Sequence, residues 1–191
     1  MDTVTGMDWI RRYVRLARIR LTATRRGPLD IHDVSIVPDR VWLSDIDELR
    51  HMNNGVYLML LDHGRTDLML RSGGWTKMMA AGVYPVVSAQ MIAYRRSLEL
   101  GQRFQTESRI VGYDDVGVYM DQRIVRNGEI YARAYVQGRF LRMTGGTAPI
   151  REVGEIVGVD VSAHPIPEWM REWAAQVRLP STKSPAPSTW D

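Results

Sequence analysis

The sequence has no cysteine among its 191 residues, which excludes disulfide bonds, thiolate metal sites and a cysteine nucleophile. It also lacks a Walker A or GxGxxG glycine loop for a nucleotide phosphate, and a GxSxG motif for an activated serine. The four histidines do not have the spacing of a zinc finger or of an HExxH site. We therefore expect no bound metal and no cofactor.

Long apolar runs are also missing. No stretch of about 18 uninterrupted apolar residues occurs, so we expect no transmembrane helix. Arginines interrupt the region where a signal peptide would need its hydrophobic core, and we expect a cytoplasmic protein. With 45% hydrophobic and 25% charged residues the composition is ordinary for a globular chain, and the length suits one domain with extensions.

Residues 7–21 predict an amphipathic basic helix. Its apolar side consists of Trp9, Ile10, Tyr13, Val14, Leu16, Ala17 and Leu21. Its arginine side consists of Arg11, Arg12, Arg15 and Arg18. Two interpretations remain open: a helix packed on the domain with its arginine face in solvent, or peripheral attachment to an anionic membrane surface. With the Gly-Pro break that follows, residues 1–28 are predicted to form a helix and linker.

The remainder predicts an α+β domain over residues 29–160 and a short helix with a flexible tail over 161–191. The segment 54–71 predicts a helix that is apolar nearly all round through 56–61 and again at 68–70, which is typical of a buried helix, and the Ser-Gly-Gly after it should end that helix. Strands are predicted at 31–44, 84–98, 103–115, 117–126 and 129–143. The last four should form an antiparallel meander, with the first strand in the same sheet. Residues 150–159 remain ambiguous, and 167–177 predict a helix.

The polar stretch WLSDIDELRHMNNGVY, residues 42–57, lies between the first strand and the long helix. One asparagine suits the helix N-cap, because its side-chain oxygen accepts a free backbone N–H. Capping does not explain Asp45, Asp47 and His51. A helix N-terminus offers N–H groups and a partial positive charge that stabilise an oxyanion, and a nearby carboxylate can act as nucleophile or general base. This combination is sufficient to hydrolyse an ester or a thioester.

The same stretch resembles the signature of the hot-dog-fold acyl-CoA thioesterases, in the 4-hydroxybenzoyl-CoA thioesterase branch, which is roughly D-x-D-x-x-G-H-(V/M)-N-N-x-x-Y. The matching residues are Asp45, Asp47, His51, Met52, Asn53, Asn54 and Tyr57. Asp62 and Arg65 match a later D/E-x-x-R feature. The segments SDIDELRHMNNGVYL, RRSLELGQRF and GYDD are similar to the thioesterase-superfamily-member-6-like group. The resemblance covers about residues 31–143.

The resemblance implies an antiparallel sheet of five or six strands wrapped around the 54–71 helix, in a homodimer or homotetramer with active sites between subunits. The implied activity is hydrolysis of an acyl-CoA or acyl-carrier thioester to a free acid and a thiol. The CoA moiety then belongs to the substrate and is not a cofactor, and no nucleic-acid partner is expected. The alternative is a non-catalytic acyl- or CoA-binding or membrane-associated hot-dog protein. A hydratase of this fold fits less well, because its Asp and His stand five residues apart around a proline.

By resemblance, Asp47 is the catalytic carboxylate and the backbone N–H of Asn54 is the oxyanion donor. Supporting roles in the loop and pocket fall on Asp45, His51, Asn53 and Tyr57. Arg50 departs from the pattern, because it stands where the family has a glycine that allows an unusual backbone angle. It would either narrow the site or supply a positive charge. Candidates for contact with CoA phosphates are Arg95, Arg96, Arg139 and Arg142, which would otherwise be solvated charges at a sheet edge.

Overall fold

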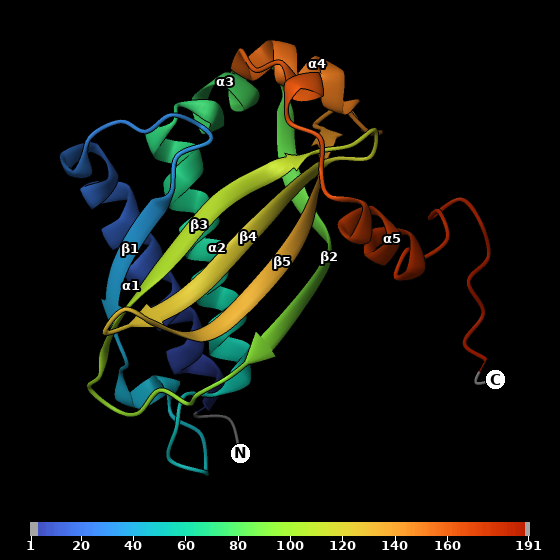
Figure 1. Ribbon diagram of the computed structural model, residues 1–191. Helices are drawn as coiled ribbons and strands as arrows, with labels where there is room; N and C mark the ends of the chain where they lie inside the picture. The colour runs from blue at the N-terminus through green and yellow to red at the C-terminus, as the bar shows by residue number, and fades with distance from the viewer. Residues whose placement is uncertain (1–3, 190–191) are drawn as a thin grey trace.

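A computed structural model describes residues 4–189 of the chain, with side chains from residue 13 onward. Five antiparallel strands form one sheet in the order β1-β3-β4-β5-β2, and this sheet curves around the long helix α2 (Asn54–Arg71) (Figure 1). The strands are β1 (Ser35–Arg40), β2 (Val83–Tyr94), β3 (Arg103–Tyr113), β4 (Val118–Arg126) and β5 (Glu129–Arg142). The predicted α+β class, with a sheet around the 54–71 helix, is confirmed.

The strand order corrects the predicted meander of four strands. Only β3, β4 and β5 are consecutive neighbours, whereas β2 pairs with β5 at the far end of the sheet. The predicted strand 84–98 ends at Tyr94, because the chain then crosses beneath the start of α2 to reach β3. Leu98 fixes this crossing: it is fully buried, and its backbone bonds Met52 and the Tyr57 hydroxyl. The pairing of β2 thus depends on a long connection that local patterns do not specify.

The first strand joins the same sheet, as predicted, but it is shorter than the predicted span 31–44. It covers Ser35–Arg40 and pairs with β3, where Pro38 lies opposite Gln105. Because β1 is an edge strand, the missing N–H of proline can face away from the ladder without loss of a hydrogen bond. Ser35 and Val37 point inward and are buried, while Ile36 between them is exposed, which is the expected period of two.

The sequence of α2 accounts for its central position. Leu60 and Leu61 are almost fully buried and pack in one cluster with Ile124 and Ala132 of the sheet. Gly64 permits the close approach, since a Cβ there would lie 2.4 Å from the Ser108 Oγ of β3. The apolar pattern that predicted a buried helix over 54–71 is therefore confirmed with the same bounds.

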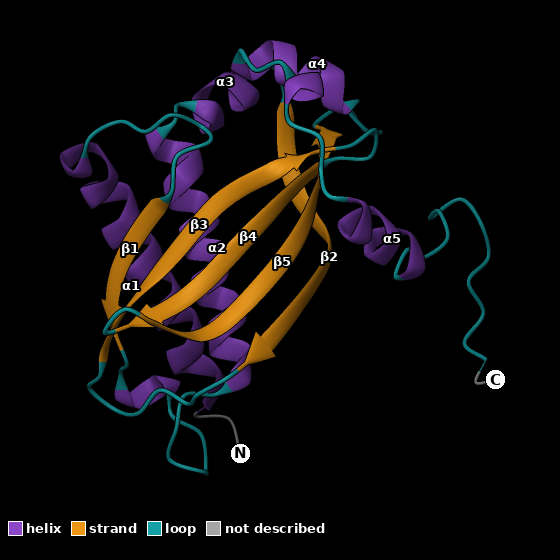
Figure 2. Ribbon diagram, in the orientation of Figure 1, coloured by secondary structure: helices purple, strands orange, loops and turns teal. Residues whose placement is uncertain are grey.

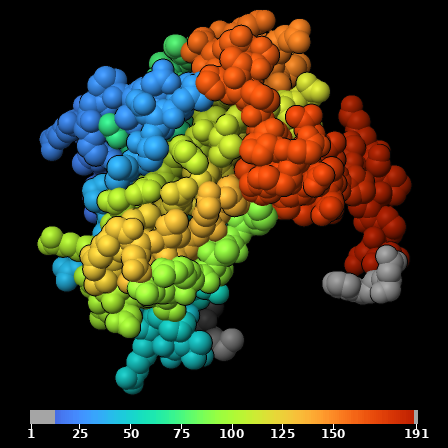
Figure 3. Space-filling model, in the orientation of Figure 1, coloured from blue at the N-terminus to red at the C-terminus, as the bar shows by residue number. Residues whose placement is uncertain are grey.

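Three short helices complete the described domain (Figure 2). The chain leaves α2 through Gly73, which has a φ of +72°, and enters α3 (Gly74–Ala80), which the sequence analysis missed. The ambiguous segment 150–159 forms α4 (Ile150–Val157), and the predicted C-terminal helix is α5 (Glu168–Gln176). Helices α3 and α4 pack together at one end of the sheet, beside the end of α2. Helix α5 lies against the outer face of the sheet through Met170 (Figure 3).

The N-terminal helix α1 (Val4–Ala23) packs on α2, but not through the predicted face. The predicted solvated arginine face is wrong at Arg15, which is 1% exposed, while Tyr13 (62%) and Leu21 (71%) on the predicted apolar face are exposed. The contact face is Arg15, Ile19 and Ala23, spaced four residues apart, because Arg15 neutralises buried carboxylates of the domain. The side chains of Trp9, Ile10, Arg11 and Arg12 lie outside the described residues.

Candidate functional site

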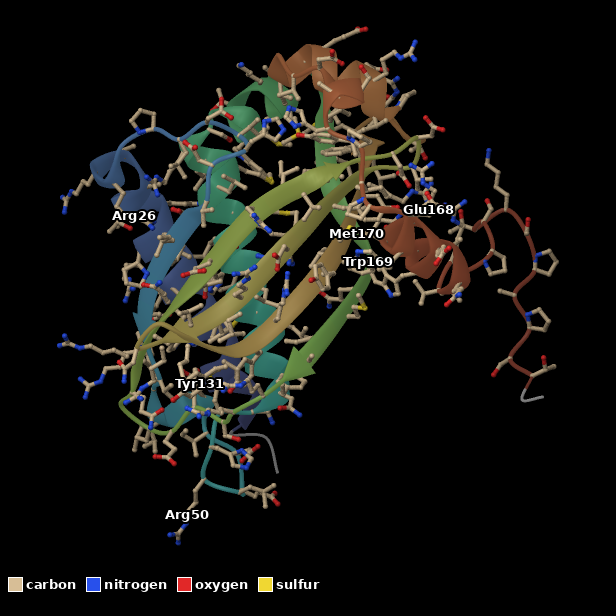
Figure 4. All side chains as sticks on the ribbon, in the orientation of Figure 1. Arg26, Arg50, Tyr131, Glu168, Trp169 and Met170 are labelled. Atoms are coloured by element: carbon tan, nitrogen blue, oxygen red, sulfur yellow. The ribbon has the colours of Figure 1, made fainter. Side chains whose placement is uncertain are left out.

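The predicted catalytic stretch forms a small hairpin between β1 and α2. After a short 3₁₀ turn (Leu43–Asp45), the N–H of Asn53 bonds the carbonyl of Asp45 at 2.8 Å, and the N–H of Asp47 bonds the carbonyl of His51 at 3.0 Å. The tip of the hairpin extends into solvent, with the Arg50 side chain pointing away from the sheet (Figure 4). The hairpin therefore carries five of the predicted site residues, Asp45, Asp47, Arg50, His51 and Asn53, next to the start of α2.

Asp45 fixes the base of this hairpin to α1. It is completely buried, and its two oxygens accept hydrogen bonds from Arg15 at 2.9 and 2.7 Å and one from the Trp42 N–H at 2.8 Å. Arg15 also lies 2.9 Å from Asp39 and stacks over the Trp42 ring at 4.8 Å. Charge-assisted hydrogen bonds to a buried carboxylate hold it in one position, so Asp45 is fixed by α1 rather than open to a substrate.

Asp47, the predicted nucleophile or base, is more accessible. Its side chain is 24% exposed. One carboxylate oxygen accepts the N–H of Leu49 at 2.9 Å and lies 3.5 Å from the Nδ1 of His51. This is an Asx turn, in which aspartate bonds its own backbone two residues on. The turn orients Asp47 through one carboxylate oxygen, and His51 is the side chain that lies beside that oxygen.

Arg50 explains why a glycine suits this position. Its φ is +65°, in the left-handed region that glycine adopts without strain and that a side chain with a Cβ disfavours. The side chain is exposed at the hairpin tip. In the described chain it does not cover Asp47 or the helix start, so the departure from the family pattern acts on the backbone of the loop.

The start of α2 presents the predicted oxyanion donor. The Oδ1 of Asn53 accepts the N–H of Gly55 at 2.8 Å, which makes Asn53 the N-cap. The N–H of Asn54 bonds no acceptor within residues 4–189, and Asn53 and Asn54 are both exposed. An unbonded N–H at a helix start carries part of the positive end of the helix dipole. This is the electrostatic property that an oxyanion donor requires.

Tyr57 stabilises the start of α2 from its buried side. Its hydroxyl accepts the Leu98 N–H at 3.2 Å, and its ring meets that of Tyr94 edge-on at 5.2 Å. Burial raises the pKa of both tyrosines above the ordinary value, so both stay neutral. The Tyr94 hydroxyl in turn donates to the carbonyl of Asn54 at 3.3 Å. The two tyrosines therefore link the β2–β3 crossing to the first turn of α2.

The arginines predicted to contact CoA phosphates lie in two separate places. Arg95 and Arg96 follow β2 and both pair with Glu129, at 3.1 and 2.6 Å, with about half of each side chain exposed. A hydrogen bond from Arg95 and the charge of Arg96 lower the pKa of Glu129. Arg142 instead pairs with Glu152 of α4 at the opposite end of the sheet. Arg95 and Arg96 thus share the end of the domain that holds the hairpin, whereas Arg142 does not.

A second feature was not predicted: a cavity of about 340 Å³ along the other half of α2. Asp62 and Arg65, which matched the family feature but received no role, line it together with residues of α3, α4 and the inner face of the sheet. Arg65 donates to the Oδ1 of Asp62 at 3.2 Å and to Gln122 at 2.6 Å. Neither Asp47 nor Asn54 lines this cavity. The sequence signal for it is the acidic and basic pair Asp62 and Arg65, three residues apart in a helix predicted to be buried.

Two further properties bear on the candidate chemistry. Within the described residues no group of three or more His, Asp or Glu side chains is placed to hold a metal ion. Likewise, no helix in that part of the chain has the length and apolar character needed to cross a membrane. The predicted absence of a cofactor stays a prediction.

Solved structures with the same fold include YbaW, a probable thioesterase from Escherichia coli, which matches with a TM-score of 0.59 and 23% identity over 64% of this chain and 98% of that chain. The 1,4-dihydroxy-2-naphthoyl-CoA thioesterase Slr0204 from Synechocystis matches with a TM-score of 0.57 and 14% identity over 70% of this chain and 100% of that chain. At these identities the match establishes the fold, and the predicted hot-dog architecture is confirmed.

Sequence comparison agrees with the structure. The chain is 34% identical over 123 residues to Protein THEM6 of Danio rerio and 32% identical over 129 residues to Protein THEM6 of Xenopus laevis, which covers 64% and 68% of this chain. The aligned region spans 61% of the length of each of these relatives. The model of the thioesterase-like superfamily matches residues 41–174, which include the hairpin, α2 and most of the residues that line the cavity. The chain therefore belongs to the thioesterase-like superfamily, as the resemblance predicted.

Proposed function

We propose that the protein hydrolyses an acyl-CoA or acyl-carrier thioester to a free acid and a thiol. The observation that carries this proposal is the exposed start of α2, where the unbonded N–H of Asn54 follows directly on the hairpin that carries Asp47. A carboxylate beside a donor for the developing oxyanion is the minimum that thioester hydrolysis requires. Membership of the thioesterase-like superfamily supports the same reaction class.

In the proposed reaction, the N–H of Asn54 bonds the thioester carbonyl oxygen and stabilises the negative charge that develops there. Asp47 either attacks the carbonyl carbon, forming an acyl anhydride and expelling the thiolate, or removes a proton from a water molecule that attacks instead. In the first route water then cleaves the anhydride and regenerates the Asp47 carboxylate. Both routes give one carboxylic acid and one thiol and consume one water.

A second carboxylate competes with Asp47 for this role. Asp62 lines the cavity and is paired with Arg65, and its side chain is 47% exposed. Asn54 and Asp62 are eight residues apart on one helix, a separation of about 12 Å along its axis. One reacting carbonyl cannot contact both ends of that span. The two carboxylates are therefore separable by mutation.

The test is hydrolysis of a panel of acyl-CoAs by the natural protein and by Asp47→Asn and Asp62→Asn. Loss of a positioned acid–base or nucleophilic group should lower kcat by roughly 10²- to 10⁴-fold. We expect this loss in Asp47→Asn, with a smaller change in Asp62→Asn. The reverse pattern would transfer the catalytic role to Asp62. An absence of turnover with every acyl-CoA and acyl-carrier thioester would contradict the proposed activity.

We also propose that the protein works as a homodimer or homotetramer. Strand β2 lies at the end of the sheet and, within the described chain, pairs only with β5. A twelve-residue edge strand with an unpaired ladder is a template for another strand. Light scattering after size exclusion should give a mass of two or four chains of 21.8 kDa. A single-chain mass at working concentration would contradict this assembly.

A peripheral membrane association remains the second candidate function, and the exposed side of α1 favours it. Tyr13, Val14 and Leu21 are 62%, 47% and 71% exposed, and Arg18 and Arg20 lie beside them in solvent. Apolar residues flanked by arginines suit an anionic bilayer surface. Flotation with anionic and with neutral vesicles, using the full chain and Leu21→Asp, tests this. Equal flotation of both proteins with anionic vesicles would contradict it.

A further inference from the structure

The cavity beside α2 has one open and one closed end. Its open end includes Asp62, whose side chain is 47% exposed, and Val87 of the edge strand, which is 43% exposed. Elsewhere the lining is more enclosed: Leu68 of the helix, Val136 of β5 and Val153 of α4 are buried, whereas Met69 and Trp75 are half-buried. Its volume of about 340 Å³ is within the range of sites that bind small molecules.

The lining also changes from polar to apolar along the same direction. At the open end, Arg65 holds the Asp62 carboxylate at 3.2 Å and the Gln122 side chain at 2.6 Å. Desolvation lowers the pKa of Arg65, and the Asp62 charge opposes that shift. The lining from α3, α4 and the sheet at the closed end is mostly apolar, such as Met78 and Phe140, with Tyr113 among its few polar side chains. A ligand that fits has a polar group at one end and a hydrocarbon body.

The shape of the cavity selects among hydrocarbon bodies. Its lining residues on α2 extend from Asp62 to Leu70, about 12 Å along the helix axis. An elongated space of this length suits an extended chain better than one aromatic ring. Protein interiors are normally close-packed, and an empty apolar cavity lowers stability in proportion to its volume. Apolar cavities also hold water poorly, so a hydrocarbon chain is the occupant that matches this lining.

We propose that this cavity binds an unbranched aliphatic chain, which passes Asp62 and Arg65 at the open end and has its methyl end against α4. As a statement about substrate class, the assignment rests on the proposed thioester hydrolysis and names the acyl group as aliphatic. As a binding site it does not depend on hydrolysis. The chain enters between α2 and the edge strand β2, and helix α4 determines how far it can extend.

Direct binding tests the site without requiring turnover. Saturated fatty acids of increasing length are titrated into the full chain by calorimetry, with thermal stability as a second readout, since a ligand of the native state raises it. Each added pair of methylenes that stays inside the cavity should tighten binding roughly tenfold, until the cavity is full. Affinity independent of chain length would overturn the proposal.

Two variants reduce the cavity from opposite walls: Val157→Phe on α4 and Thr66→Phe on α2, both at half-buried positions that line it. Val177→Phe adds the same volume at an exposed position outside the lining and is the matched control. We expect the first two to weaken binding of the longest chains about tenfold and that of short chains little. Melting curves show whether each variant folds, and the second variant keeps the test decisive if the first does not fold. Unchanged long-chain affinity in both folded variants would overturn the proposal.

The same variants separate this proposal from the proposed activity. Chain binding without hydrolysis of any thioester would contradict the thioesterase and leave the cavity assignment standing. Hydrolysis with no dependence on chain length and no response to Val157→Phe or Thr66→Phe would contradict the cavity assignment and leave the thioesterase standing. If both proposals hold, the effect of chain length on hydrolysis also shows where along α2 the reacting carbonyl lies. If the reacting carbonyl lies at Asn54, the acyl chain must extend about 12 Å along α2 before it reaches the cavity at Asp62. The cavity-filling variants would then slow the hydrolysis of long acyl chains only. A carbonyl at Asp62 would make short chains respond as well.

Discussion

The two ends of α2 differ in chemistry and in how they are held. At its start, the hairpin of residues 45–53 is polar, partly exposed, and fixed by directed hydrogen bonds, with Arg15 and Asp45 at its base. At its end, α3, α4 and the sheet enclose a cavity whose wall is almost entirely apolar. The start of α2 is therefore surrounded by charged and polar groups, and its end borders an enclosed space with a mainly apolar wall. A reaction on a lipid-like thioester requires both, and α2 connects them.

The largest expected effect on stability is at the polar end. Arg15→Ala removes the partner of Asp39 and Asp45, and breaking a buried pair costs about 3–5 kcal/mol. Arg18→Ala is the matched control one turn along α1, because Arg18 is 45% exposed and lies 3.4 Å from the same Asp39; its loss should cost less than about 1 kcal/mol. Urea unfolding measures both changes. Similar losses in the two variants would show that the hairpin does not depend on its buried anchor.

A smaller effect on stability, a gain instead of a loss, is expected at the hairpin tip. Arg50→Gly relieves the left-handed backbone at φ +65°, which costs about 1–2 kcal/mol for a residue with a Cβ, less the entropy that glycine loses on folding. The net result should be a gain of roughly 0.5–1 kcal/mol in the free energy of unfolding.

The control for this gain is Leu49→Gly, at the neighbouring exposed position, where φ is not positive. It should lower stability, because glycine there adds entropy to the unfolded chain and relieves nothing. Chemical unfolding of both variants measures the difference. A loss of stability in Arg50→Gly would show that the Arg50 side chain makes a contribution that exceeds the backbone strain.

The smallest effect concerns pH at the cavity end. Burial and the charge of His164, which stacks on it at 4.0 Å, lower the pKa of His32 below its ordinary value of 6.5. The unfolded chain therefore takes up this proton first as the pH falls. The stability that neutral His32 contributes is fully present above about pH 6.5 and is lost as the pH falls toward the folded pKa.

His32→Gln should flatten this part of the stability curve, measured by melting temperature between neutral and mildly acidic pH. His51→Gln is the control at the polar end, because His51 is 37% exposed beside Asp47 and has no such apolar surroundings. An unchanged slope in His32→Gln would show that the stacked histidines do not govern the acid response of this end.

Local patterns were sufficient for most of the fold. The period of α2, the alternation of β3 to β5 and the Asn-Gly turn between β4 and β5 were readable, because each depends on residues close in sequence. The place of β2 was not, because pairing with β5 depends on where the chain crosses beneath α2. The face of α1 was misjudged for a similar reason. Arg15 is buried only because two aspartates from another segment surround it.

The sequence by itself determined the α+β class and the buried helix, and it singled out Asp47 and Asn54 in the polar stretch that leads into that helix, since motif and periodicity are properties of neighbouring residues. Only the tertiary structure decided that Asp45 is an anchor for α1 and that the strand order ends in β2. It also decided that Asp62 and Arg65 face a cavity. The physical reason is that burial and enclosed volume are properties of several segments together. Neither burial nor enclosed volume can be predicted from the residue pattern of a single segment.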